Sequence, residues 1–450
     1  MIHDSQHFVY IENQFFITST SDSQHPVKNK IGAAIVERIL RAHNAGEKYK
    51  MIICIPSVPG FAGDLHADDA LGTRAIMEYQ YNAICKGDHS ILGALKKAGI
   101  ADPSEYIRFY NLRNYDRLNV NDTLSNIEKT SHVDYREAQR EHDDIIGAGF
   151  GGEGYGTGAV EGRSNPNLDG YQQAASKILS KDGTKYDTVS ECYMYNGPSI
   201  KDIPFAGSEE DEINAFVSEE LYIHTKLLIA DDRVVICGSA NLNDRSQLGY
   251  HDSEIAVVVE DTATVDSKMN GRQFQAAKFA ASLRRQIFRK HLGLLPGQDW
   301  TKPTANFLPI NKDPNIYDWE SAPDVLVQDP LSTDFETLWN STAKKNTAIF
   351  AKAFHCVPDD RVRNWDQYEN FYSKLFVSPN KKGKYTLPTP AGIYQYGHVV
   401  REEFPGGVKE LKEWLDGVRG SLVEMPLNFM KDVDFAHGLA LNSLTEPIYT

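Results

Sequence analysis

Apolar positions recur along the first 112 residues with two different periods. A two-residue or continuous apolar pattern marks strand-like segments, and a helical period marks the segments between them. The strand-like segments lie at 8–19, 49–56 and 106–112, and the helix-like segments lie at 31–45 and about 68–99. Strands that alternate with helices are typical of a sheet with helical crossovers. The pattern therefore predicts an α/β fold in which a mixed β-sheet is flanked by helices.

The regular pattern ends near residue 113. From there to about residue 215 the chain is polar, and glycines dominate its centre at 147–162. Such a composition buries too little apolar surface to form a core. We therefore expect a surface insertion that is largely disordered. It is either a tolerated insertion or a loop that faces a membrane or regulates the protein.

Strand-like segments resume near residue 216. ELYIHTKLLIADDRVVICGS predicts a hairpin that turns at 231–233, and SEIAVVVED (253–261) predicts another buried strand. A helix is expected over about 271–292. Its basic end, SLRRQIFRKHL, suits either the negative end of the helix dipole or contact with a membrane surface. Residues 296–450 have fewer periodic segments and more prolines, and we expect an extension that packs on the sheet domain.

Composition and charge narrow the class of protein. The chain has 450 residues, 41% hydrophobic and 24% charged, and a formal net charge of −15. The acidic balance argues against a nucleic-acid partner. The five cysteines are scattered, which indicates reduced thiols in a cytoplasmic protein rather than a disulfide frame or a zinc site. We find no secretory signal and no run of 18 apolar residues, and we expect no transmembrane helix.

The hairpin carries an unusual group of polar residues. On a strand, His224 and Lys226 would face the same side, and an imidazole beside an ammonium is favourable when an anion lies between them. Gly238 would allow close backbone approach, and Ser239 and Asn241 would add donors for phosphate oxygens. The alternative is a surface hairpin with an ordinary charged tip.

These residues resemble a known signature. HTKLLIAD (224–231) followed by GSAN (238–241) is similar to the HxKxxxxD, or HKD, motif of the phospholipase D superfamily. YIENQFFITS, IPSVPGFAGD, FHCVPDDRV and the C-terminal EPIYT also resemble segments of eukaryotic phosphatidylcholine phospholipases D. The chain looks most like the C-terminal half of a fungal-type enzyme. On that resemblance, 1–112 is the first part of the catalytic half, 113–215 an insertion, 216–295 the motif and its helix, and 296–450 a C-terminal extension.

The resemblance implies a role for each candidate residue. His224 would be the general acid and base, and Lys226, Ser239 and Asn241 would bind the substrate phosphate. Asp231 would stabilise the motif rather than contact substrate. Glu254 would accept a hydrogen bond from His224 and fix its tautomer, or else is a surface carboxylate at a strand start.

Three further polar residues lie in the first strand. Glu12, Asn13 and Gln14 interrupt an apolar segment, and buried polar groups need partners. We expect them to line or brace the site. The implied chemistry needs no metal and no cofactor.

The motif occurs only once. None of the other 13 histidines has a lysine two positions later, whereas enzymes of this type use two motifs that meet across a pseudo-twofold axis. Three readings follow: a fragment that lacks an N-terminal HKD half, a dimer in which two copies each lend one motif, or a catalytically inactive module that binds phospholipid or a partner. Under the first two, the expected activity is hydrolysis of phosphatidylcholine, with transphosphatidylation, by a cytoplasmic protein peripheral on membranes.

Overall fold

A computed structural model of the chain describes residues 1–60, 65–66, 70–117, 122–135, 137–138, 141, 166–179, 199–203, 205, 207–295, 319–376, 399–438, 446 and 450. The chain forms two compact units. The larger consists of 1–115, 217–296 and 303–450, and the smaller of 116–216 and 297–302.

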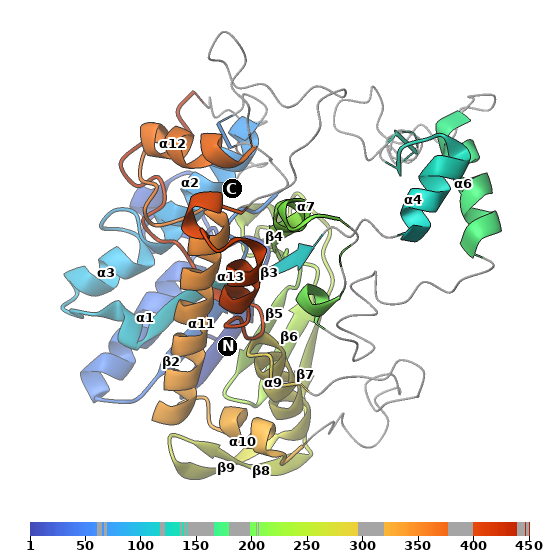
Figure 1. Cartoon of the computed structure of the whole chain (residues 1–450). Coiled ribbons are helices and arrows are strands. Elements are labelled where there is room, and N and C mark those ends of the chain that lie inside the picture. Colours follow the sequence, from blue (N-terminus) through green and yellow to red (C-terminus); the bar gives the residue numbers. More distant parts are fainter. Residues whose placement is uncertain are drawn as a thin grey trace. The chain divides into compact units, whose positions relative to one another are not determined.

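The larger unit is built on a mixed sheet of eight strands (Figure 1). The order is β10–β3–β2–β1–β5–β6–β7, with β4 beside β3. β1, β2 and β3 are parallel, and β5, β6, β7 and β10 each run antiparallel to a neighbour. The strands are β1 (Phe8–Glu12), β2 (Lys50–Cys54), β3 (Ile107–Arg117), β4 (Phe216–Glu220), β5 (Leu227–Ala230), β6 (Val234–Gly238), β7 (Ala256–Glu260) and β10 (Leu422–Glu424). The predicted mixed sheet is confirmed.

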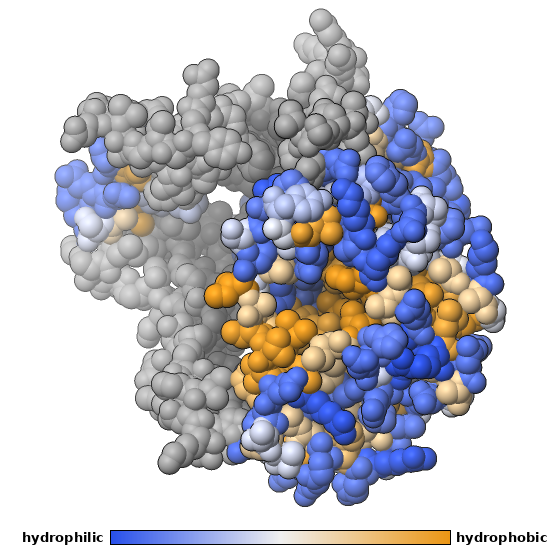
Figure 2. Space-filling view, turned by 180° about the vertical axis from the view of Figure 1, so that it is seen from behind, coloured by the Kyte–Doolittle hydropathy of each residue, from blue (hydrophilic) through white to orange (hydrophobic). Residues whose placement is uncertain are grey.

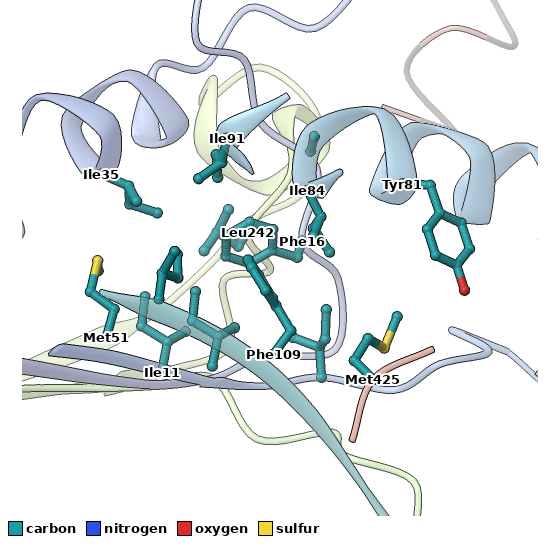
Figure 3. Close-up of a cluster of buried hydrophobic side chains, with 14 of the residues drawn as sticks. Ile11, Phe16, Ile35, Met51, Tyr81, Ile84, Ile91, Phe109, Leu242 and Met425 are labelled. Carbon is teal, nitrogen blue, oxygen red and sulfur yellow. The ribbon is translucent and has the colours of Figure 1, made fainter. Parts of the chain in front are cut away.

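Successive residues of a strand point to opposite sides of the sheet. Both sides carry apolar side chains here, and helices cover both. Val9 and Ile11 face a core shared with α1 (Ile31–Ala45), α2 (Leu71–Ile84) and α3 (Ile91–Lys97), part of which Figure 3 shows. Phe8 and Tyr10 face a second core. That core is shared with α9 (Lys278–His291), α10 (Ala322–Gln328) and α11 (Thr333–Phe354). The remaining α-helices and strands described in this unit are α8 (Asp244–Gln247), α12 (Trp365–Phe376), α13 (Gly407–Leu415) and the hairpin β8 (Thr264–Met269) with β9 (Arg272–Ala277).

Several boundaries differ from those predicted. The helix expected over 68–99 is two helices, α2 and α3, separated by a turn at 85–90. The helix expected from 271 begins at Lys278, because 272–277 form β9. The C-terminal extension does more than pack on the sheet, since its strand β10 pairs with β3.

The smaller unit contains helices where the sequence predicted an irregular insertion. These are α4 (Asp122–Ser131), α6 (Pro166–Leu179) and α7 (Glu209–Ala215). Ile127, Val133 and Tyr171 belong to a small apolar core of this unit. The predicted disorder of the glycine-rich segment at 147–162 lies outside the described residues.

The predicted burial of the 253–261 strand is wrong. β7 ends the sheet, and among the described strands only β6 pairs with it. Ile255, Val257 and Val258 are 77%, 57% and 58% exposed. Figure 2 shows that apolar side chains also gather on part of the face turned away in Figure 1. An exposed apolar edge strand is a surface that commonly accepts a partner.

The membrane contact considered for the basic end of α9 does not hold for most of its cations. Arg284, Arg285, Arg289 and His291 are each at most 3% exposed. Arg284 forms two hydrogen bonds with Asp232 of the β5–β6 turn, and Arg285 pairs with Asp324 of α10 at 3.0 Å. These arginines therefore join α9 to its neighbours. In the part of the chain that the structure describes, no helix combines the length and apolarity needed to cross a bilayer.

We expect Gly238→Ala to destabilise the protein by about 1–3 kcal/mol, because the added methyl overpacks the β6–β7 contact. A Cβ at Gly238 would lie 2.7 Å from Ala256 Cα, in backbone that cannot move aside. Urea unfolding measures the effect. Gly60→Ala is the control, since its nearest neighbour would be Thr73 Oγ1 at 3.4 Å. Equal stability of the two variants would contradict the close approach.

Candidate active site

The HxK segment lies at the start of β5 and not within it. β5 begins at Leu227, so the expectation that His224 and Lys226 share one face of a strand is wrong. His224 is exposed, whereas Lys226 is only 9% exposed. The ring of His224 stacks beside Tyr222, with 6.4 Å between ring centroids. The imidazole is therefore accessible to a ligand.

Lys226 is held by the segment that follows β1. Its Nζ donates to Gln14 Oε1 at 3.0 Å and to the carbonyl oxygen of His224 at 2.7 Å. Gln14 Nε2 in turn donates to Tyr222 Oη at 2.9 Å. Burial lowers the pKa of Lys226, and the nearby Glu254 carboxylate opposes that shift. The ammonium thus has a fixed direction and incomplete solvation, as suits an anion-binding group.

The GSAN segment is fixed beside Lys226 by Asn13. The amide nitrogen of Gly238 donates to the Lys226 carbonyl at 3.1 Å. Asn13 Oδ1 accepts from the Leu242 amide at 3.0 Å, and Phe16 forms an isolated bridge with Leu242. Residues 12–17, 224–227 and 238–242 therefore meet in one place, although they are distant in sequence.

Asn241 contains a buried acceptor that is not satisfied. Its Oδ1 has no hydrogen-bond partner among the described residues. An unpaired polar atom in a protein interior is costly, and it is most common where a ligand or water completes the site.

Glu254 is linked to the site through serines. Its Oε2 accepts from Ser239 Oγ at 2.5 Å, and its Oε1 accepts from Ser246 Oγ at 2.6 Å. Within the described residues, the carboxylate oxygens of Glu254 accept from these hydroxyls, and the predicted hydrogen bond from His224 to Glu254 is not formed. Glu254 therefore orients Ser239 and adds negative charge near Lys226.

Glu12 forms a buried polar cluster with Tyr10 and His291 next to the HxK segment. Its Oε1 accepts from Tyr10 Oη at 2.6 Å and bonds His291 Nε2 at 2.9 Å. Burial raises the pKa of Glu12, but the hydrogen bond and charge of His291, with help from Tyr10 and Thr225, hold it below the ordinary value of 4.5. Thr225 lies between His224 and Lys226 in sequence, and its side chain hydrogen-bonds Glu12. The buried cluster therefore supports the HxK segment.

We expect Glu12→Gln to reduce the free energy of unfolding by about 1–3 kcal/mol at pH 7. The folded-state pKa of Glu12 is below its unfolded value of 4.5. Its stabilisation is therefore fully present above pH 4.5 and is lost as the pH falls through the folded-state pKa. Urea titrations of wild type and variant at several pH values measure the difference. A difference that is constant from pH 7 to pH 3 would contradict the ion pair.

Asp231 lies at the other end of β5 from His224. Its carboxylate accepts the amide protons of Gln6, His7 and Phe8 at 2.7, 2.7 and 2.8 Å. It is buried and has a positive φ of 54° in the turn. These contacts fix the hairpin against the start of β1.

Sequence reasoning missed four residues of this region: Tyr222, Ser246, His291 and Glu220. Glu220 accepts hydrogen bonds from Ser57 Oγ at 3.0 Å and from the Val58 amide at 3.3 Å, and burial raises its pKa. Tyr222 and Glu220 are close to the motif in sequence, so their position was a usable signal. His291 is 279 residues from Glu12, and no local pattern indicates that pairing.

No metal centre accompanies this cluster in the described ranges. There, no three His, Cys, Asp or Glu side chains are grouped in a way that could hold a metal ion.

Comparison with known proteins identifies the relatives of the chain. A family model described as phospholipase D matches residues 1–146 and 196–306. The chain is 33% identical over 433 residues to phospholipase D1 of Cricetulus griseus, which covers 96% of this chain and 28% of that protein. It is 36% identical over 293 residues to phospholipase D1 of Schizosaccharomyces pombe, covering 65% of this chain and 15% of that protein. It is 30% identical over 436 residues to phospholipase D zeta 1 of Arabidopsis thaliana, covering 96% of this chain and 28% of that protein. The chain thus spans less than a third of the length of these relatives.

Proposed function

Because the chain belongs to the phospholipase D family, we propose that it supplies one half of the active site of a phospholipase D. The substrate is phosphatidylcholine, and the products are phosphatidic acid and choline. One observation carries this proposal: an exposed His224 stands next to a Lys226 ammonium that Gln14 fixes beside the GSAN segment. Residues 1–112 and 216–295 form the catalytic half, and the described part of 296–450 packs on it and adds strand β10 to its sheet.

The proposed reaction has two steps. In the first, a histidine supplied by a second half attacks phosphorus, a phosphorus–nitrogen bond forms, and the bond to the choline oxygen breaks. His224 donates a proton to that oxygen. In the second, His224 removes a proton from water, and the resulting hydroxide releases phosphatidic acid from the phosphohistidine. A primary alcohol in place of water gives a phosphatidylalcohol.

The phosphate is held by groups fixed in advance. The Lys226 ammonium and the NH2 group of the Asn241 side chain donate to the phosphate oxygens as negative charge develops, and Ser239 adds a hydroxyl that Glu254 orients. Donors that are already positioned need no reorganisation as charge builds, so they favour the transition state. Glu12, Asn13 and Gln14 act as positioning residues, and Asp231 stabilises the hairpin.

The second histidine comes from outside these 450 residues, since His224 is the only one in an HxK pattern. The exposed edge strand β7 supports a protein partner, because Ile255, Val257 and Val258 present apolar surface beside the GSAN segment. We favour an N-terminal HKD half as that partner over a second copy of the chain. The bilayer that holds the substrate is the second partner, and we propose that the protein works at its cytoplasmic surface.

Reconstitution tests the proposal. The purified chain is given phosphatidylcholine vesicles and ethanol, alone and after co-expression with the HKD-bearing N-terminal part of a relative, and phosphatidylethanol is measured. We expect product only from the co-expressed pair. Product from the chain alone that rises with the dimer population would favour two copies. No product from a folded pair would contradict the activity and leave a phospholipid-binding module.

A further inference from the structure

A cavity of about 530 Å³ lies beside the core that α1, α2 and α3 share. Its walls come from the end of α2 with the turn after it (78–87), from α3 (92–96), and from the segment that follows β10 (427–435). None of the described residues that line it belongs to the candidate active site. The cavity is therefore a separate site, and its volume is within the range of about 300–1,000 Å³ that is typical of small-molecule sites.

Buried apolar side chains form the floor of this cavity. Tyr81, Phe429, Met430 and Phe435 line it and are each at most 4% exposed. Tyr81 extends from α2 (Figure 3), and its hydroxyl already donates to the carbonyl oxygen of Pro426 at 2.9 Å. These side chains therefore offer contact to an apolar group rather than hydrogen bonds.

Three partly exposed residues continue the apolar lining toward the opening. Leu92 comes from α3, and Cys85 and Leu427 come from the other two walls. Cys85 Sγ donates to the Leu427 carbonyl oxygen at 3.3 Å, and burial raises the pKa of Cys85 to about 12. The thiol is thus neutral at pH 7, and a neutral thiol packs like a small apolar group.

Most of the charged groups in the lining are already neutralised. Glu78 pairs with Lys86 at 2.5 Å, and Asp432 pairs with Arg363 at 3.0 Å. Lys86 Nζ also donates to the carbonyl oxygen of Val433 at 3.0 Å, so this ammonium is turned toward the protein. A ligand therefore meets little net charge from these groups.

Two lysines of the lining keep an unpaired charge. Lys96 lies in the last turn of α3 and Lys431 in the segment after β10, and both are exposed. Within the described residues neither forms a salt bridge, and Lys431 Nζ donates to the neutral Asn428 Oδ1 at 3.1 Å. The cavity thus combines an apolar floor with two ammonium groups from different walls.

We propose that this cavity binds an amphiphile that has one apolar chain and one anionic group. The chain packs on the floor and leaves water, which is favourable in proportion to the apolar area that it buries. The anionic group lies between Lys96 and Lys431, whose ammonium groups donate to carboxylate or phosphate oxygens. A fatty acid and a single-chain lysophospholipid both have this chemistry.

Helix α2 links the cavity to the candidate active site. Gln80 is fully buried and directly precedes Tyr81. Its Oε1 accepts from the Phe16 amide at 3.2 Å, and its Nε2 donates to the Pro56 carbonyl oxygen at 3.1 Å. Phe16 forms a bridge with Leu242, directly after the GSAN segment. A ligand that restrains α2 therefore also restrains the two segments that meet at this bridge.

Calorimetric titration of the 450-residue chain with decanoate, below its micelle concentration, tests the charged part of the site. The double variant Lys96→Gln, Lys431→Gln removes the unpaired cations. The matched control Lys97→Gln, Lys409→Gln removes two exposed lysines that do not line the cavity. We expect the dissociation constant to rise about fivefold in the first variant and less than twofold in the control. No binding by the wild type, or equal weakening in both variants, would overturn the proposal.

Two further variants test the apolar part. Leu92→Trp fills the cavity from α3, and Leu427→Trp fills it from the opposite wall, so the result does not depend on the folding of one variant. We expect each folded variant, checked by urea unfolding, to lose decanoate binding. Undiminished binding by a folded tryptophan variant would place decanoate elsewhere on the protein and would contradict the site.

A ligand series separates the two sources of the amphiphile. Tighter binding of decanoate than of decanoyl lysophosphatidic acid supports a fatty acid, and the reverse order supports a lysophospholipid. Both ligands should bind more weakly to the Lys96→Gln, Lys431→Gln variant. Decanol lacks the charge and acetate lacks the chain, so each should bind at least about tenfold more weakly than decanoate. Equal affinity for decanol and decanoate would overturn the assignment of an anionic ligand.

Discussion

Replacing His224 by alanine should lower phosphatidylethanol formation by about 10²–10⁴-fold in the enzyme reconstituted with an N-terminal half. The variant removes the proposed general acid, and the choline oxygen must then leave without a proton. His224 is exposed, and its ring makes no hydrogen bond within the described part of the chain, so the fold should not change. The measurement is the initial rate at saturating ethanol, together with urea unfolding of the isolated chain.

His437→Ala is the matched control, because His437 is exposed and distant in sequence from the motif. We expect it to retain the wild-type rate. If His224→Ala kept more than about a tenth of the activity, or lost it only because it unfolds, His224 would not be the acid.

The largest effect on stability is expected from Arg284→Met, at about 3–5 kcal/mol. Arg284 and Asp232 are both fully buried, and their hydrogen bonds are 2.6 Å from Nε and 2.7 Å from Nη2. The variant leaves Asp232 charged and unpaired in the interior, under the hairpin that carries the motif. Urea unfolding at pH 7 measures the loss.

Two further variants separate the pair from general helix effects. Lys290→Gln on the same helix should change stability by less than about 0.5 kcal/mol, because Lys290 is exposed. The double variant Asp232→Asn, Arg284→Met should lose less than the sum of its single changes, since no charge stays buried alone. A loss below about 1 kcal/mol for Arg284→Met would contradict a buried ion pair.

The strands of the larger unit could be predicted from sequence where the pattern is local. The helix predicted at 31–45 and the hairpin turning at 231–233 agree with α1 and with the β5–β6 connection. Both depend on periodicity and on turn residues within one short segment. The burial of β7 could not be predicted correctly, because its apolar pattern is that of a covered strand and no sequence feature marks it as an edge.

The paired arginines of α9 show a second limit. From sequence they read as a solvated basic helix end, since arginines are rarely buried without partners. Their partners, Asp232 and Asp324, lie 52 and 39 residues away, and only the folded chain brings them together.

The sequence indicated which candidate residues lie close together, and it indicated their geometry less well. The polar residues of the first strand stood out because they interrupt an apolar segment. In the structure, Asn13 accepts a hydrogen bond from the Leu242 amide and Gln14 accepts one from Lys226. β5 begins only at Leu227, so His224 and Lys226 precede the strand, and His224 is exposed whereas Lys226 is buried. The end of a strand depends on pairing with its neighbour, which the composition of the segment does not show. His291 was missed for the same reason as Asp232 and Asp324, the partners of the α9 arginines: it is far in sequence from the residue that it contacts.

The most direct measurement is to trap the covalent intermediate in the reconstituted enzyme. Phosphatidylcholine labelled in its phosphate is mixed with the pair and quenched in alkali, which preserves phosphohistidine, and the two polypeptides are separated. We expect label on the N-terminal half and none on the 450-residue chain, because in the proposed reaction the other histidine forms the bond to phosphorus and His224 only donates and accepts protons. Label on His224, or product without label on either polypeptide, would contradict a site shared between two halves.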